Sequence, residues 1–296
     1  MSGAVTAVSA ATLFDPLQYA FFQKGLLVAT VAGALLGVIG VYITLRGMSY
    51  IGHGLSHAIF GGFAAAQLLS ANLYLLGAGI WGVGSALSIN GVARRYRIGA
   101  DAAIGVITTA SFALGVALFS KFGSSGPAFD NALFGSILGI STEQILLLLA
   151  VSALTAAFIA VRYRALLFVT FDPEVAEASG VPARRVDSVF MALLSLAILA
   201  TLTVIGVTLV AAMLVIPAVI ARMLTDSFGR MMWLSTAIGA SCGLVGMYAS
   251  YFAGVPSGTM IVLTGAALFV GVLIVTGARG LRRTSGLAEH HGLEVR

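Results

Sequence analysis

Residues 47–93 read GMSYIGHGLSHAIFGGFAAAQLLSANLYLLGAGIWGVGSALSINGVA, and no Asp, Glu, Lys or Arg occurs among them. A transmembrane helix needs ~20 predominantly apolar residues. This run is therefore long enough to cross a bilayer twice, and Ser70-Ala71-Asn72 predicts the turn between the two crossings. The first half of the run also contains His53 and His57. Ionisable side chains inside a membrane are costly, so this pair calls for an explanation.

The whole chain has the composition of a membrane protein. Of its 296 residues, 59% are hydrophobic and 9% are charged, against roughly 25% charged residues in a soluble domain. We expect an all-α polytopic membrane protein, built as one bundle of helices in the lipid bilayer. The formal net charge of +5 does not indicate nucleic-acid binding. The basic residues are scattered at the ends of apolar runs, where arginine marks cytoplasmic loops.

Uncharged runs predict about nine transmembrane helices, or eight if the shortest pair forms one span. As a single helix, residues 188–221 would measure roughly 51 Å at ~1.5 Å per residue, so we expect two short helices broken near Gly206. The last run is expected to turn at residues 254–258, Gly-Val-Pro-Ser-Gly. The complete set of runs is 25–45, 47–93 (two spans), 102–120, 144–161, 188–221 (two spans) and 231–278 (two spans).

The basic residues predict the orientation in the membrane. Nine spans with the N-terminus outside place every arginine inside and leave only Lys24 and Lys121 outside. This distribution matches the excess of basic residues in cytoplasmic loops. We therefore expect an extracytoplasmic segment over residues 1–16, a transmembrane domain over residues 17–280, and a polar cytoplasmic tail over residues 281–296.

Two polar segments interrupt the apolar pattern. The outer one, between Lys121 and Glu143, contains the uncharged residues 131–142. Twelve residues are too few to span the membrane. We expect a re-entrant short helix on the outer side, because non-helical backbone at membrane depth must be buried in protein or line a cavity.

The inner polar segment, FDPEVAEASGVP at residues 171–182, carries the signals of a short helix. Asp172 is a typical N-cap, Pro173 suits the first helical position, and Glu174 is an acid in the first turn. Gly180 is a typical C-terminal stop. We expect a capped cytoplasmic helix. It could transmit force from a soluble partner, and an ordinary connecting loop would fit the same residues equally well.

Glycines at small-xxx-small spacing predict close helix packing. The two pairs are Gly33/Gly37 and Gly239/Gly243, and this spacing lets helix backbones approach each other. Cys242 is the only cysteine, so no intrachain disulfide can form and we expect it to pack between helices.

The histidine pair is the strongest functional signal. His53 and His57 are four residues apart, so both imidazoles project from one face of a helix. Imidazole suits zinc, copper, iron and nickel, and manganese less readily. The pair could supply two of four ligands, with the others from other helices, backbone carbonyls or water. Alternatively each ring hydrogen-bonds to a neighbouring backbone group, but two rings in register favour function. His290 and His291 are expected to be solvated.

Two absences bear on the energy source. No Asp, Glu, Lys or Arg falls inside a predicted span, whereas proton- or sodium-coupled carriers usually keep an intramembrane carboxylate. The chain also contains no GxxxxGK[ST] phosphate-binding loop. Together the absences suggest that a partner supplies the energy.

Four segments resemble the permease subunits of the manganese/zinc/iron uptake ABC transporters. MSYIGHGLSHA at residues 48–58 is similar to the second-helix motif of that family, and NALFGSILGIS at residues 131–141 to its outer short helix. Residues 171–182 resemble the cytoplasmic coupling segment, and GVTLVAAMLVIPAVIAR at residues 206–222 resembles the late helix before the last two spans. The likeness covers most of residues 17–280 in consistent order.

The resemblance implies a permease dimer, most simply a homodimer, that encloses a pathway across the bacterial cell membrane. Two cytoplasmic ATPases would bind ATP and dock on the coupling helices, and an extracytoplasmic metal-binding protein would deliver the ion. The metal is then the substrate, and neither a permanently bound cofactor nor a catalytic residue is expected. The coupling residues implied are Asp172, Pro173, Glu174, Glu177, Gly180 and Pro182.

The resemblance also assigns the histidines. His57 matches the motif histidine of the family, a proposed metal ligand in the pore, and His53 stands where the family usually has aspartate. Exchanging an anionic oxygen for a neutral nitrogen should shift the site from manganese towards zinc. We therefore expect the permease of an ABC importer for zinc, manganese or iron. The alternatives are a permease for metal chelates of the siderophore or cobalamin type, or a self-contained secondary carrier.

Overall fold

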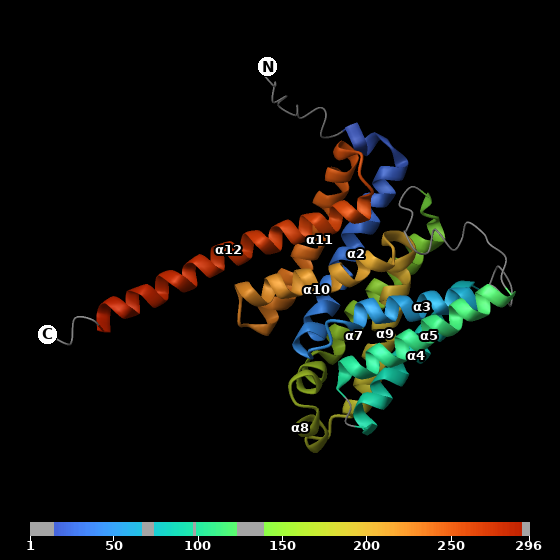
Figure 1. The fold of residues 1–296 in the computed structure, drawn as a ribbon, viewed down its shortest axis with the longest axis horizontal. Coiled ribbons are helices and arrows are strands. Elements are labelled where there is room, and N and C mark those ends of the chain that lie inside the picture. The colour runs from blue at the N-terminus through green and yellow to red at the C-terminus, as the bar shows by residue number, and fades with distance from the viewer. Residues whose placement is uncertain (1–14, 67–73, 97–98, 123–138, 292–296) are drawn as a thin grey trace.

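The computed structural model describes residues 15–66, 74–96, 99–122 and 139–291, and every regular element in these ranges is a helix (Figure 1). This confirms the predicted all-α membrane fold. The helices are η1 (Asp15–Gln18), α2 (Ala20–Leu45), α3 (Ile51–Ala66), α4 (Tyr74–Tyr96), α5 (Ala100–Phe122), α7 (Thr142–Phe171), α8 (Pro173–Ala178), α9 (Ala183–Ile205), α10 (Val207–Leu224), α11 (Phe228–Ala253) and α12 (Ser257–His291).

The number of membrane-crossing helices agrees approximately with the prediction. Seven helices of the described residues are long and apolar enough to cross a membrane, namely α2, α4, α5, α7, α9, α11 and α12. Two more, α3 with 16 residues and α10 with 18, are shorter and pack inside the bundle. The nine predicted spans therefore correspond to seven full-length helices and two short ones among the residues described.

Both predicted breaks in the last third of the chain are confirmed. Gly206 separates α9 from α10 with φ 91° and ψ 159°, dihedrals that are open almost only to glycine. Gly254 ends α11 in the left-handed conformation, with φ 65°, as glycine commonly does after a helix. The turn expected at Ser70-Ala71-Asn72 and most of the outer short helix expected over residues 131–142 lie outside the described residues.

Two helices are longer than the apolar runs that predicted them. The run 144–161 stops at Val161, but α7 continues to Phe171, with non-helical dihedrals at Arg162 (φ −106°, ψ 18°). The charge of Arg162 ends the apolar run without ending the helix, because a helix can continue beyond the membrane. For the same reason α12 continues to His291, into the segment expected to be a polar tail.

The centre of the bundle is formed by α2 and α9. In their apolar segments 67% and 72% of the residues are buried, against 17% in α12. The predicted glycine pairs bring α2 against α11. A methyl group at Gly33 would clash with the carbonyl oxygen of Gly239, and one at Gly243 with the carbonyl oxygen of Ala29. The small-residue spacing therefore predicted a real helix–helix contact.

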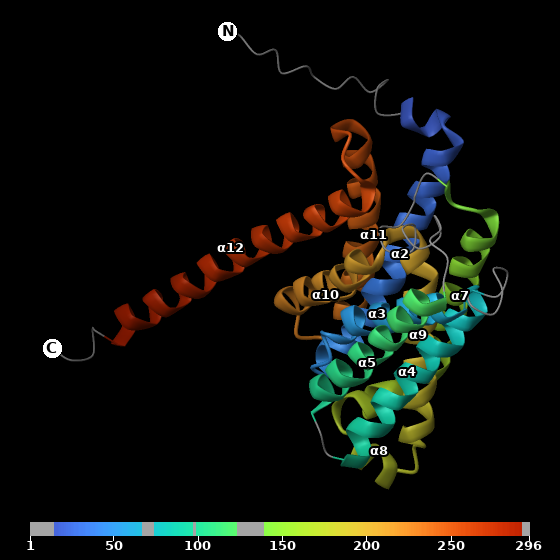
Figure 2. The same cartoon turned by 45° about the vertical axis from the view of Figure 1, so that its right-hand side comes forward.

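The helix that carries the histidines lies in a second group. Helices α3, α4 and α5 pack together, with α3 also in contact with α9 and α10, and Figures 1 and 2 show this group side by side. The last helix, α12, extends away from the bundle in both views (Figure 2). Helix α3 thus packs against α4 and α5 on one side and α10 on another, while α4 also packs directly against the central helix α9.

Candidate metal pathway and coupling region

A tight turn fixes where α3 begins. After α2 ends, Gly47 adopts φ 68°, and the Met48 N–H donates to the Ile43 carbonyl at 3.0 Å. The Ile51 N–H then donates to the Met48 carbonyl at 3.0 Å. The left-handed glycine reverses the chain direction at the end of α2, so the histidine helix follows directly on the central helix.

Glycines hold α3 close to its neighbours on two sides. A Cβ added at Gly52 would meet Leu214 of α10 at 2.8 Å, and one at Gly54 would meet Thr108 Oγ1 of α5 at 2.9 Å. Ser56 is buried, and its hydroxyl donates to the Gly52 carbonyl at 2.7 Å within the helix. These contacts fix the rotation of α3 about its axis and therefore the direction of its remaining face.

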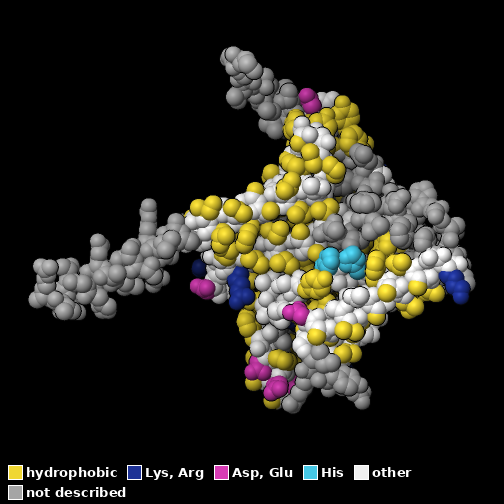
Figure 3. Space-filling model, viewed as in Figure 1, with side chains coloured by type: hydrophobic (Ala, Val, Ile, Leu, Met, Phe, Trp, Pro, Cys, Tyr) yellow, Lys and Arg dark blue, Asp and Glu magenta, His cyan; other side chains and the backbone are white. Residues whose placement is uncertain are grey.

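His53 and His57 lie on that remaining face. Both are half-buried, whereas Gly52, Gly54, Leu55, Ser56 and Ala58 to Gly62 of the same helix are buried. In the space-filling view the histidine side chains are visible on an open face of the molecule, among apolar side chains (Figure 3). The described residues therefore leave the imidazoles partly accessible from outside.

The two rings are in contact with each other. The ring centroids of His53 and His57 lie 4.5 Å apart at an interplanar angle of 77°. Tyr50 packs against His53 with centroids 5.3 Å apart, and Phe112 of α5 packs against His57 at 5.2 Å. The predicted i, i+4 pairing is thus present in the structure, with an aromatic ring at either end of the pair.

Among the described residues of one chain, no third His, Cys, Asp or Glu side chain joins the pair. No group of three or more His, Cys, Asp or Glu side chains that could hold a metal ion occurs among them. A tetrahedral site for zinc usually has four ligands, so two imidazoles would leave it half complete. Any further ligand would come from water, from a backbone carbonyl, from another chain, or from residues outside the described ranges.

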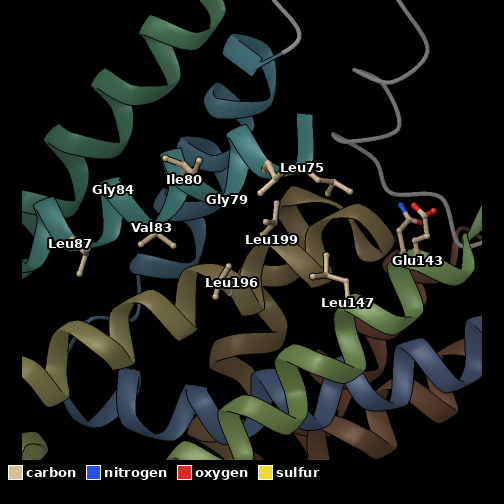
Figure 4. A pocket seen from close by; sticks show the side chains of 12 residues that line it. Leu75, Gly79, Ile80, Val83, Gly84, Leu87, Glu143, Leu147, Leu196 and Leu199 are labelled. Atoms are coloured by element: carbon tan, nitrogen blue, oxygen red, sulfur yellow. The ribbon is translucent and has the colours of Figure 1, made fainter. Parts of the chain in front are cut away.

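A large groove elsewhere in the bundle is unsuited to metal. It has a volume of about 680 Å³ and lies between α4, α7 and α9. Leucine and other apolar side chains project into it, and Glu143 stands at one end (Figure 4). One carboxylate among apolar side chains offers too few ligands for a divalent cation.

The predicted cytoplasmic helix is present as α8. The Asp172 carboxylate accepts hydrogen bonds from the N–H groups of Glu174 and Val175 at 3.1 and 2.9 Å, and Pro173 is the first helical residue. The helix ends at Ala178, and Gly180 follows with φ 81°. The capping signals were correct: the helix begins two residues after the start of the 171–182 motif and ends four residues before its end.

The surface around α8 is suited to a soluble partner. Phe168, Phe171 and Val175 are exposed apolar side chains, and Glu174 and Glu177 are exposed acids. Two hollows flank them, of about 660 Å³ beside Arg162 to Ala165 and about 490 Å³ over residues 180–185. Exposed apolar side chains ringed by charges are typical of protein-binding sites.

Sequence reasoning missed one buried charged pair. Arg46 stands just outside an apolar run, so its position predicts only that it lies on the cytoplasmic side with the other arginines, and nothing near Asp187 in the sequence indicates its partner. In the structure they form an ion pair in which each side chain is 9% exposed. They are 141 positions apart in the chain, so no local pattern could have paired them.

Comparison with known proteins decides the family. The sequence profile of the ABC 3 transport family matches residues 18–276. The chain belongs to the ABC 3 transport family. The resemblance to metal-uptake ABC permeases is thereby confirmed.

Several metal transport proteins are similar over nearly the whole chain. The manganese transport system membrane protein MntC of Listeria innocua is 35% identical, over 90% of this chain and 94% of the relative. The manganese transport system membrane protein MntB of Synechocystis is 36% identical, over 88% and 85%. A probable iron transport system membrane protein of Haemophilus influenzae is 32% identical, over 87% and 94%.

Solved structures have the same fold. PsaBC from Streptococcus pneumoniae in complex with Fab matches with a TM-score of 0.78 and 32% identity, over 90% of this chain and 95% of that one. An inward-facing, putative metal-chelate type ABC transporter matches with a TM-score of 0.69 at 17% identity. That second likeness shows a shared fold alone.

Proposed function

We propose that this ABC 3 family chain is the membrane permease of an importer that moves a divalent transition metal ion, manganese, zinc or iron, into the cell. ATP would be hydrolysed on a separate cytoplasmic subunit, and the chain itself would perform no catalytic step. The similar proteins support this proposal, because they are named as manganese or probable iron transport proteins. The match to this chain covers 85% or more of the length of each of them.

One observation carries the assignment of the ion contact. His53 and His57 are the half-buried polar side chains on an otherwise buried part of α3, and their rings touch. For a purely structural role, the rings would be expected to be buried against the same chain and hydrogen-bonded there. Leaving both rings on an open face instead suits a ligand that arrives from outside the chain.

A second permease copy would complete the site. Two copies facing each other across this side of α3 would bring four imidazoles together, which is a suitable donor set for a four-coordinate ion. The pathway would then lie between the copies, in line with the dimer that the family resemblance implies.

The coupling residues fit the same mechanism. Closure of two ATPases would displace α8, whose N-cap Asp172 and residues Glu174 and Glu177 are exposed. The helices of the bundle would then alternate between outward-open and inward-open arrangements. We propose that α8 lies in the cytoplasm and the N-terminus outside, the orientation that the positive-inside rule favours. An extracytoplasmic metal-binding protein would then deliver the ion on the outer side.

The identity of the cargo rests on two opposing arguments. Relatives at 32–37% identity are named for manganese or iron transport, whereas the nitrogen donors of His53 and His57 favour zinc. We propose manganese and zinc as the two cargoes to compare first.

Reconstitution tests the proposal. The chain, its ATPase and its binding protein are placed in liposomes, and ATP-driven accumulation of radioactive manganese and zinc is measured. We expect accumulation only with all three components. Accumulation by the purified chain alone would establish a secondary carrier instead, and accumulation of a metal chelate but of no free ion would establish a chelate permease.

A further inference from the structure

The guanidinium of Arg46 joins three helices at one end of the bundle. Arg46 is the C-cap residue of α2, and it donates through Nη1 to the carboxylate of Asp187 in α9. Its Nε and Nη2 donate to Thr170 Oγ1 of α7 at 3.3 and 3.2 Å. Cζ also lies 4.8 Å from the ring centroid of Phe190, a cation–π distance. One side chain thus holds α2, α7 and α9 together.

The two hydrogen-bond partners of Arg46 flank α8. Thr170 precedes the N-cap Asp172 by two residues, and the Asp172 N–H donates to the Phe168 carbonyl at 2.9 Å. Asp187 follows in α9, and the Val181 N–H donates to the Ala176 carbonyl at 3.0 Å. Backbone hydrogen bonds therefore connect α8 to the end of α7 and to the segment that leads into α9. A displacement of α8 would thus shift Thr170 and Asp187, which accept hydrogen bonds from the guanidinium.

On its other side, Arg46 leads directly to the histidine helix. The Arg46 N–H donates to the Tyr42 carbonyl at 3.1 Å, and the hydrogen-bonded turn at Gly47 and Met48 joins it to Ile51, where α3 begins. Tyr50, in this turn, packs its ring against His53. No unstructured linker separates the guanidinium from the candidate ion contact.

Packing alone does not require an ion pair at this place. Burying two charges has a desolvation cost that can exceed the Coulombic gain, and apolar replacements of similar volume are often as stable. A guanidinium, however, can donate hydrogen bonds to two partners at once from a rigid planar group. An apolar side chain cannot donate any, and the ammonium of a lysine stands on a flexible stem that fixes no such geometry. The residue type chosen here is therefore one that fixes the relative position of two partners.

We propose that Arg46 is a positioning residue that transmits the displacement of α8 to the turn at residues 47–50 and to α3. In transport, a movement imposed by the ATPase on α8 shifts Thr170 and Asp187, and the guanidinium carries that shift to the helix of His53 and His57. The role in transport rests on the proposed function, but the mechanical link can be measured without any metal.

The chain offers a simple way to follow the turn. Cys242 is the only cysteine, so Cys242→Ala combined with Tyr50→Cys leaves one reactive thiol at a position that is 53% exposed in the native chain. The labelled chain is assembled in nanodiscs with a cysteine-free ATPase subunit. The rate of thiol modification is then compared with and without a non-hydrolysable ATP analogue.

In the parent chain, which carries only Cys242→Ala and Tyr50→Cys, we expect the nucleotide to change the rate of thiol modification several-fold. Adding Arg46→Lys should abolish this change while the ATPase subunit and the nucleotide still bind. Thr170→Val, which removes one acceptor without changing side-chain shape, should reduce it. Arg230→Lys, an exposed arginine at the start of α11, is the matched control and should retain it. In the reconstituted system, Arg46→Lys should lower metal uptake per ATP hydrolysed at least fivefold.

Three results would overturn the link. The first is that nucleotide leaves the modification rate at position 50 of the parent chain unchanged. The second is that the Arg46→Lys chain keeps the full nucleotide-dependent change. The third is that both Arg46→Lys and Thr170→Val lose ATPase binding, which would indicate a structural role only. A nucleotide-dependent change without metal uptake by the wild-type complex would support the link and contradict the proposed function, so the two failures are distinguishable.

Discussion

His53 and His57 touch each other ring to ring, with centroids 4.5 Å apart, on a side of α3 that the described residues of the chain leave partly open. Contact between the rings means that one ion can meet both side chains at once. Because the glycines of α3 fix the helix against α5 and α10, the pair cannot turn into the bundle without disturbing that packing. The position of the pair is therefore a property of the fold.

Replacing His57 tests the ion contact. We expect His57→Ala to lower ATP-driven metal uptake at least tenfold, because changes around a metal ligand typically cost 10- to 100-fold in affinity. Assembly with the ATPase, measured by co-purification, should be unchanged. The double variant His290→Ala/His291→Ala removes two imidazoles from the far end of the chain and should transport normally. Full uptake by His57→Ala would remove the pair from the mechanism.

Replacing His53 tests the choice of metal. His53→Asp restores an anionic oxygen at this position, and oxygen ligands suit manganese better than imidazole does. We expect the ratio of manganese to zinc uptake, measured by competition in the same vesicles, to rise about tenfold, the size of effect typical for a changed ligand environment. An unchanged ratio would place the selection elsewhere, for example in the delivery protein.

The cap of α8 can be removed by changing one exposed residue that precedes the helix. Asp172→Ala leaves the N–H groups of Glu174 and Val175 without their acceptor, which costs about 0.5–2 kcal/mol of helix stability. We expect uptake per ATP hydrolysed to fall, with partial recovery in Asp172→Ser, whose hydroxyl can also cap. If the serine variant behaved like alanine, the charge of Asp172 and not the cap would be what the ATPase recognises.

The contact between α2 and α11 makes a prediction about stability. Gly33→Ala would push a methyl group into the backbone of Gly239, and overpacking of this kind costs about 1–3 kcal/mol. We expect a lower unfolding temperature in detergent. Gly271→Ala, where an added Cβ meets nothing within 4 Å, is the matched control and should unfold as the wild type does. Equal unfolding temperatures would mean that α2 and α11 separate readily.

Much of the architecture could be predicted because its causes are local. An apolar run of sufficient length must become a helix in a bilayer, since unpaired backbone groups are too costly there. The break at Gly206 followed from run length, and the ends of α8 from Asp172, Pro173 and Gly180. The extension of α7 beyond Val161 was missed, because hydropathy detects where the membrane ends and the helix continues past that point.

By itself, the sequence determined that the chain is a helical membrane protein, that two histidines share one helix face, and that a capped helix stands between two spans. Only the tertiary structure decided which way that face points and which charges meet. The direction of His53 and His57 depends on how the glycines of α3 meet α5 and α10, and the pairing of Arg46 with Asp187 joins positions 141 residues apart. Contacts of this kind depend on the rotation and approach of whole helices, which no periodicity within a single helix specifies.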